Sequence, residues 1–429
     1  MKFGHSFQEA LKGESYPQHW VDKAIPYRQL KKILANVREE LINKGYDPET
    51  IHRLLAEHRA KYSLESGESH LLRPRLIVQP APSTPTLTLQ EPPLEPESEA
   101  ESGTQGHAPE NDGHGTLDVE GGEADEASWV KVPLDSDRKF FNILQTDVDE
   151  LDSLQSEERK SMNDKIAALG YEIAEVAKPK KKIQISGSDL YRWREIFELY
   201  LTAQVFFSTS EFTSGARNSE NARKQLVWFQ GELEKRRIVQ YFKLEASINA
   251  YKRFLELNAT LLRNVQFQEL NQTAVVKIIK KFDKQTSLGV KTRFPQALQP
   301  THFIAESIAK DVCAQISSEV LAIVPQVADY TCTICLSICW LPILLDCDHR
   351  FCIRCMIKMQ NRNKRYCPLC RANTVLNATD INIDTQMMKF LEKWFPKEVK
   401  EKQAVNEQDR RKELFGVLVD DTPPSCCVM

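Results

Sequence analysis

Apolar residues recur at helical spacing along most of the chain, which predicts a mainly α-helical protein. Pro26 can open a helix and Gly45 can close it. Between them five apolar positions follow the helical period: Tyr27, Leu30, Ile33, Leu34 and Val37. A second helix is predicted from Asp47. Long patterns over residues 189–207 and 218–262 predict an antiparallel bundle or hairpin, and residues 301–327 predict a further helix.

The helical pattern is lost after about Ser63, where Pro, Ser, Gly and Glu dominate. The segment contains a dense acidic run over residues 91–126. Such a composition cannot bury enough apolar surface to offset the entropy of ordering the chain. Residues 63–135 are therefore predicted to be a disordered acidic insert.

Charge and hydropathy narrow the class of protein only slightly. The net charge of the 429 residues is -3, which does not indicate a particular class of binding partner. We expect no nucleic acid among the partners. Residues 1–10 lack the apolar stretch of a secretory signal. The longest apolar stretch, residues 333–345, is shorter than the roughly 20 residues of a spanning helix. We expect a cytoplasmic protein without a transmembrane segment. The basic run at residues 178–182 leaves nuclear import open, although it is more often a solvated loop.

Eight of the 11 cysteines lie from Cys332 to Cys370, and all of them except Cys339 stand at short regular spacings. In a reducing compartment such a cluster predicts metal ligands rather than disulfides. Zinc closes a tetrahedron of four Cys or His ligands, and a Cys-x2-Cys knuckle gives two sulfurs to one metal. Four such pairs predict two Zn²⁺ ions. The eight ligands are Cys332, Cys335, Cys347, His349, Cys352, Cys355, Cys367 and Cys370.

The order of three Cys, one His and four Cys resembles the RING family, whereas the PHD family places its histidine fifth. The resemblance implies a cross-brace, in which alternate pairs share a metal. It assigns Cys332, Cys335, Cys352 and Cys355 to one zinc, and Cys347, His349, Cys367 and Cys370 to the other. Cys339 lies outside the series and is predicted to pack as a small apolar residue.

The resemblance also implies a ubiquitin-protein ligase that binds a ubiquitin-conjugating enzyme charged with ubiquitin. Ile334 and Pro368 match the family's apolar contact positions. Arg371 follows the last ligand, where active members often carry a cation that bridges the conjugating enzyme and ubiquitin. The other interpretation of Arg371 is a solvated surface charge. Met359 stands where many members have Trp, which puts the choice of conjugating enzyme in doubt.

A second informative stretch lies at residues 277–284. Lys277, Lys280, Lys281 and Lys284 share one helical face, at i, i+3, i+4 and i+7. Lysines gathered in this way repel one another unless an anion meets them, and phosphate is a good partner for lysine. Taken alone, a solvated amphipathic face explains the pattern as well.

This lysine helix, the opening Met1-Lys2-Phe3-Gly4 and the motif at residues 27–32 together resemble an SPX domain. SPX domains are helical sensors of inositol polyphosphates and pyrophosphates. The resemblance implies a ligand site that consists of Lys2, Tyr27, Lys31, Lys277, Lys280, Lys281 and Lys284. His5 departs from the family, which often has Lys there, and the insert is unusually long.

The chain ends in Cys426-Cys427-Val428-Met429, which fits a farnesyl-type prenylation box. A lipid on Cys426 would give peripheral membrane association, but a single lipid without a basic segment binds only marginally. The alternative is an inert tail, because short motifs match by chance.

The sequence thus predicts a helical SPX bundle followed by a small zinc domain. The predicted boundaries are SPX 1–62 and 136–290, insert 63–135, connecting helix 300–328, RING 329–375, helical extension 376–396 and tail 397–429. The predicted function is a RING-type ubiquitin ligase of phosphate homeostasis, whose substrate is a phosphate transporter or its regulator. The alternative is a non-catalytic SPX adaptor whose zinc module only mediates assembly.

Overall fold

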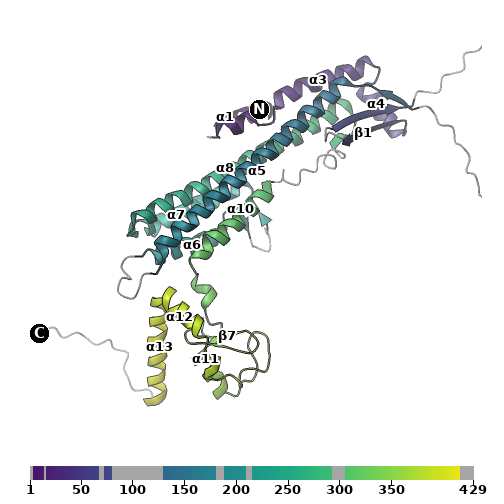
Figure 1. Ribbon diagram of the computed structural model, residues 1–429. Coiled ribbons are helices and arrows are strands. Elements are labelled where there is room, and N and C mark those ends of the chain that lie inside the picture. Colours follow the sequence, from purple (N-terminus) through teal and green to yellow (C-terminus); the bar gives the residue numbers. More distant parts are fainter. Residues whose placement is uncertain are drawn as a thin grey trace, which may run out of the picture. The chain divides into compact units, whose positions relative to one another are not determined.

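The fold is built around two helices of more than forty residues each, α5 (Asp135–Ala177) and α8 (Glu245–Thr286). The computed structural model describes residues 3–13, 16–66, 72–79, 129–179, 188–208, 215–291 and 305–415. These residues divide into two compact units, and α5 and α8, both labelled in Figure 1, each contribute residues to both units. The first unit comprises residues 1–152 and 270–301, and the second comprises residues 153–269 and 302–429.

The first unit begins with four helices, α1 (Phe3–Gly13), α2 (Gln18–Asp22), α3 (Tyr27–Asn43) and α4 (Pro48–Ala56). The apolar positions of α3 that the sequence pattern singled out are buried. Gly45 follows with a positive φ of 82°, a conformation that glycine adopts without a steric cost. Asp47 caps α4, since its carboxylate accepts a hydrogen bond from the Thr50 N–H at 2.6 Å.

A three-stranded antiparallel sheet joins α4 to α5. Its strands are β1 (Ala60–Ser66), β2 (Leu72–Val78) and β3 (Val130–Val132). Tyr62, Leu76 and Val132 stand side by side in the register and are buried. The prediction of disorder over 63–135 is therefore wrong at both borders, where long-range pairing stabilises short strands. Residues 80–128, with the acidic run, lie outside the described residues.

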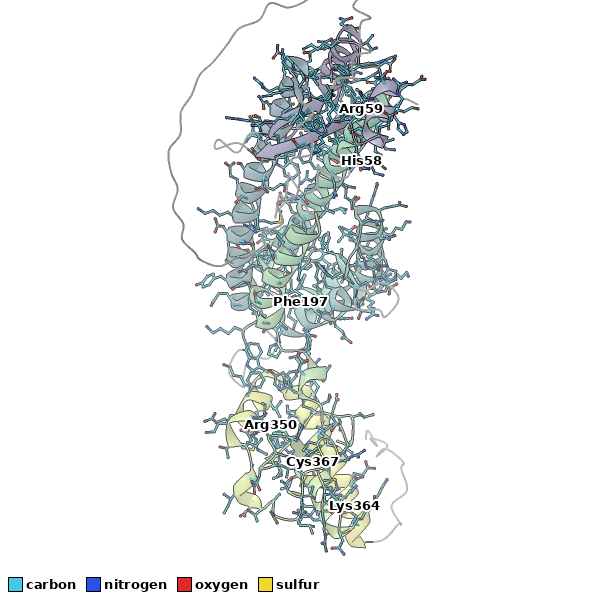
Figure 2. All side chains as sticks on the ribbon, turned by 90° about the vertical axis from the view of Figure 1, so that its right-hand side faces the viewer. His58, Arg59, Phe197, Arg350, Lys364 and Cys367 are labelled. Atoms are coloured by element: carbon cyan, nitrogen blue, oxygen red, sulfur yellow. The ribbon has the colours of Figure 1, made fainter. Side chains whose placement is uncertain are left out.

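The second unit contains α6 (Leu190–Ala203), α7 (Ser219–Lys235), a short hairpin of β4 (Phe207–Ser208) and β5 (Gly215–Ala216), and parts of α5 and α8. Its core includes Trp193, Phe197, Phe229 and Phe254 (Figure 2 labels Phe197). The continuous pattern predicted over 218–262 is broken: α7 ends at Lys235, and a 3₁₀ turn (Ile238–Tyr241) precedes α8. Asp189 stabilises this break, because its buried carboxylate accepts hydrogen bonds from the N–H groups of Lys243 and Leu244.

The helix α10 (Ala305–Glu319) packs into the same core through Val312 and Ile316. It is shorter than the predicted 301–327 helix, and two 3₁₀ turns follow it, η3 (Leu321–Ile323) and η4 (Val327–Tyr330). Pro325 explains why no helix continues to residue 327, since the residue before a proline is pushed out of the helical region and Val324 is extended. Residues 301–304 lie outside the described part.

The C-terminal module consists of the hairpin β6 (Pro342–Leu344) and β7 (Arg350–Cys352), then α11 (Ile353–Asn361), the 3₁₀ turn η5 (Asp380–Asn382), α12 (Thr385–Trp394) and α13 (Pro396–Phe415). The prediction of a tail from residue 397 is corrected, because α13 runs for 20 residues. The apolar pattern of α13 is too weak to predict a helix from the sequence. Val399 is a buried apolar residue of this helix. None of the helices in the described ranges is long and apolar enough to cross a membrane. Cys426 lies outside those ranges.

Candidate metal centres and lysine surface

Four cysteine sulfurs of the C-terminal module converge at the first candidate metal site. Cys332, Cys335, Cys352 and Cys355 place their sulfurs within 4.8 Å of one another. The sulfurs of Cys335 and Cys352 are 3.7 Å apart, and those of Cys352 and Cys355 are 3.2 Å apart. A tetrahedral zinc with Zn–S bonds of about 2.3 Å would separate its sulfurs by about 3.8 Å. These four residues therefore fit a zinc ion.

The second cluster comprises Cys347, His349, Cys367 and Cys370, whose ligand atoms also lie within 4.8 Å of one another. His349 Nδ1 is buried and has no hydrogen-bond partner among the residues that the structure describes, which is costly unless a metal ion accepts its lone pair. Each pair of ligands from one site is followed along the chain by a pair from the other. The two Cys/His clusters thus fit the two Zn²⁺ sites of a cross-brace, in the arrangement that the sequence predicted.

The first and last knuckles have matching backbone geometry. The Cys332 N–H donates to the Ser337 carbonyl at 2.8 Å, and the Cys367 N–H donates to the Ala372 carbonyl at 2.8 Å. In each knuckle the residue after the second cysteine has a left-handed backbone, with φ of 55° at Leu336 and 61° at Arg371. The knuckles are therefore tight turns, which hold the residues between their cysteines outward.

The candidate contact residues are exposed on these knuckles. Ile334 is 39% exposed, and Pro368 and Arg371 are also exposed. Met359 of α11 is half-buried. The sequence reasoning missed Leu336 and Leu369, which are 81% and 52% exposed next to the same cysteines. Leu369 lies inside a Cys-x2-Cys knuckle and Leu336 directly follows one, and these positions in the sequence could have identified both residues as exposed.

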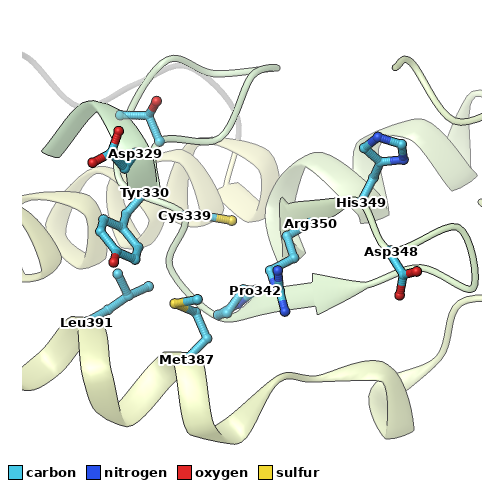
Figure 3. Close-up of a pocket in the computed structure, with 10 residues that line it drawn as sticks. Asp329, Tyr330, Cys339, Pro342, Asp348, His349, Arg350, Met387 and Leu391 are labelled. Carbon is cyan, nitrogen blue, oxygen red and sulfur yellow. The ribbon is translucent and has the colours of Figure 1, made fainter. Parts of the chain in front are cut away.

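Cys339 is buried in the small core of the module and belongs to neither ligand cluster, as predicted. It lines a pocket of about 390 Å³ between η4, the β6–β7 hairpin and α12 (Figure 3). Tyr330, Pro342 and Leu391 line it as well, together with the ligand His349. The pocket is thus a part of the metal-held module.

The predicted lysine face is formed by α8. Lys277, Lys280 and Lys284 are exposed and Lys281 is half-buried, while Ile278 and Phe282 on the other side are buried. Lys31 of α3 is exposed as well, and Lys2 lies outside the described residues. A buried hydrogen bond from the Ile25 N–H to Asn271 Oδ1, 2.9 Å long, joins the start of α3 to α8.

Tyr27, which the resemblance assigns to the ligand site, packs against α1 with a largely buried ring. Its side chain is only 8% exposed and meets the ring of Phe3 edge-on, with 5.0 Å between ring centroids. Gly4 of α1 lies so close that an added Cβ would be 3.3 Å from the Tyr27 ring. Burial raises the pKa of Tyr27. The ring is therefore a packing element between α1 and α3.

A helical domain with a lysine-bearing helix, followed by a cross-braced pair of zinc sites, defines the class of the protein, and comparisons with known proteins agree. A family model of the SPX domain matches residues 1–298. A model of the C3HC4-type zinc finger, the RING finger, matches residues 332–370. The chain belongs to the SPX family and carries a RING finger after the SPX domain.

Two relatives match the chain over nearly its whole length. An uncharacterized RING finger protein of Schizosaccharomyces pombe is 32% identical, over 95% of this chain and 96% of its own. The transcriptional regulator of yeast form adherence 3 of Candida albicans is 31% identical, over 96% of this chain and 97% of its own. The E3 ubiquitin-protein ligase TRIM31 of Homo sapiens is 27% identical over 22% of this chain and 23% of its own. No solved structure matches the chain.

Proposed function

We propose that the protein is a RING-type ubiquitin-protein ligase. The observation that carries this proposal is the exposure of Ile334, Pro368 and Arg371 on two tight knuckles that belong to the metal clusters. The likeness to a human E3 ubiquitin-protein ligase in part of the chain supports it. Zinc at these sites would have four protein ligands each and supply rigidity, since no coordination position stays open for substrate.

In the proposed mechanism the protein acts as a scaffold and forms no covalent bond to ubiquitin. Ile334 and Pro368 bind the conjugating enzyme through apolar contact. Arg371 donates hydrogen bonds from its planar guanidinium to the conjugating enzyme and to ubiquitin, which restricts the charged ubiquitin to one orientation. The neutral amine of a substrate lysine then attacks the thioester carbonyl. An isopeptide bond to ubiquitin forms, the C–S bond breaks, and the released cysteine of the conjugating enzyme leaves as a thiol with the proton that the amine loses.

Self-ubiquitination of the full chain tests this proposal. Ile334→Ala should reduce the transfer of ubiquitin at least tenfold while two zinc ions stay bound. Ile381→Ala is the matched control, because Ile381 is 91% exposed but lies outside the knuckles, and it should keep wild-type activity. If the zinc-loaded wild type transfers no ubiquitin with any conjugating enzyme, the non-catalytic adaptor is the better interpretation.

We further propose that the SPX domain binds a highly phosphorylated inositol on Lys2, Tyr27, Lys31, Lys277, Lys280, Lys281 and Lys284. Exposed lysines on α3 and α8 supply the charge, and the largely buried Tyr27 ring packs against α1. The ligand would link ubiquitin transfer to phosphate homeostasis, with a phosphate transporter or its regulator as substrate.

Calorimetry with inositol hexakisphosphate tests this site. Lys31→Ala with Lys281→Ala should weaken binding at least tenfold, and added salt should weaken the wild type because exposed charges are screened within about 8–10 Å. Lys224→Ala is the control, since Lys224 lies on α7 and pairs with Glu220 at 2.8 Å. Equal affinity in the double variant and the wild type would refute the site.

Prenylation of Cys426 is the remaining proposal from the sequence. It predicts the mass of a farnesyl group on the C-terminal peptide of protein purified from its native cells. An unmodified C-terminal peptide would leave the tail without this role.

A further inference from the structure

The helix α13 contacts both the RING finger and the SPX helix α6. At its first turn Glu398 pairs with Arg194 of α6, with 3.4 Å between Oε1 and Nη1. Near its last turn Asp409 and Glu413 pair with Arg354 and Lys358 of α11. Between them Lys402 places Nζ 3.4 Å from the sulfur of Cys335, beside the knuckle of Ile334.

Arg194 is the centre of the junction between α6 and the C-terminal module. Only 5% of the residue is exposed, and each part of its guanidinium has a partner. Nε donates to the carbonyl of Pro325 at 3.0 Å, and Nη2 donates to the carbonyl of Trp394 at 2.9 Å. The guanidinium also lies 4.3 Å from the centre of the Phe395 ring, a cation–π contact. One side chain thus binds the segment that enters the RING finger and the one that leaves it.

Tyr191, one turn before Arg194 on α6, strengthens the same junction. Its hydroxyl donates to Glu398 at 3.2 Å and accepts from the Lys397 N–H at 3.2 Å. Burial raises the pKa of Tyr191 to about 12, so the hydroxyl keeps its proton near neutral pH. The start of α13 is therefore held by a buried cation and a neutral donor, whereas its far end is held by exposed ion pairs, which are weak in water.

We propose that α13 is a strut between the SPX domain and the RING finger, and that Arg194 is the positioning residue at its root. This inference rests on the proposed ligase function. The strut fixes the direction in which a conjugating enzyme charged with ubiquitin faces relative to α6. Only lysines within reach of that direction receive ubiquitin. Loss of Arg194 should widen the set of modified lysines without changing the intrinsic reactivity of the RING finger.

Hydrogen exchange of the zinc-loaded full chain tests the strut without reference to ligase activity. Arg194→Ala should speed exchange at least tenfold in α12 and in the first two turns of α13, while α8 and α11 keep their protection. Arg192→Ala is the matched control, because the Arg192 side chain contacts Glu195 and Tyr241, away from the junction. Hydrogen exchange in this variant should equal that of the wild type. Unchanged exchange in α12 and α13 of Arg194→Ala would overturn the proposal.

If Arg194→Ala also loses the protection of α8, the milder Glu398→Gln decides, and it should speed exchange in the first turn of α13 with α8 intact. In the same samples, discharge of ubiquitin to free lysine should be equal in Arg194→Ala and wild type, and the sites of self-ubiquitination should differ. Identical sites in both proteins would contradict a positioning role. A wild type without any discharge would refute the proposed ligase function, and the exchange result would still decide whether the strut exists.

Discussion

The contact between α5 and α10 rests on a glycine, and replacing this glycine gives a prediction whose sign is set by the structure. A Cβ added to Gly170 would lie 2.3 Å from the carbonyl oxygen of Glu319 and 3.3 Å from Cδ1 of Ile323. The carbonyl is a backbone atom and cannot rotate away, so Gly170→Ala must push the end of α10 off α5. At Gly231 of α7 the same added atom would have no neighbour within 4 Å in the described part of the chain, apart from the backbone of α7 itself.

Two opposing effects decide the outcome. Alanine in place of glycine inside a helix stabilises it by about 0.5–1 kcal/mol. Overpacking a close contact costs about 1–3 kcal/mol. Gly231→Ala should therefore stabilise α7 by about 0.5–1 kcal/mol, because only the first effect operates. At Gly170 the clash is with a backbone atom, so its cost lies in the upper part of that range, about 2–3 kcal/mol. With a gain of up to about 1 kcal/mol subtracted, Gly170→Ala should destabilise the docking of α10 by about 1–2 kcal/mol.

Hydrogen exchange is the suitable assay, since a chain of several domains does not unfold in two states. A loss of about 1–2 kcal/mol should speed the exchange of α10 amides roughly 5- to 30-fold in Gly170→Ala, because about 1.4 kcal/mol corresponds to a factor of ten. Exchange in α7 should slow in Gly231→Ala. Slower exchange of α10 in Gly170→Ala would refute the close packing of α10 on α5.

Two further predictions concern titration and metal binding. Burial raises the pKa of Asp137 to about 7, although Tyr62 donates to its carboxylate. The folded state then binds a proton that the unfolded state has lost, so stability should fall by at most about 4 kcal/mol as pH rises from 4 to 7. Asp137→Asn should flatten this slope in pH-dependent thermal melts, and Asp135→Asn should not. Cys347→Ser should unfold the RING finger and lower the zinc content below two per chain, because structural zinc is coupled to folding. Metal analysis of Cys339→Ala should still find two zinc ions per chain.

The zinc ligands and the first helices could be predicted because their signals are local. The ligand spacing identifies the metal sites without knowledge of the fold. Pro26 precedes α3, Gly45 follows it and Asp47 precedes α4, and the backbone preference of each of these residues depends on its own side chain rather than on distant contacts. The exposed sites on the knuckles follow from the same spacing. These features depend on residues a few positions apart.

The missed features depend on distant partners. The strand β2 pairs with β3 across 80–128, and no local alternation marks its three-residue partner. The start of α8 is stabilised by Asp189, far away in sequence, whose carboxylate accepts from the N–H groups of Lys243 and Leu244. The helix α13 has almost no apolar face and is held by ion pairs to α11. The contact of the Tyr27 ring with Phe3 of α1 cannot be read from the helical period of α3 alone.

The central claim, that the RING finger promotes ubiquitin transfer through its exposed knuckles, is tested most directly by single-turnover discharge from a charged conjugating enzyme to free lysine. The zinc-loaded full chain should accelerate this discharge. Arg371→Ala should reduce the acceleration at least tenfold. Arg371→Lys should recover part of it, since lysine keeps the positive charge but lacks the planar guanidinium. Equal discharge with and without the wild-type protein, across a panel of conjugating enzymes, would contradict the account.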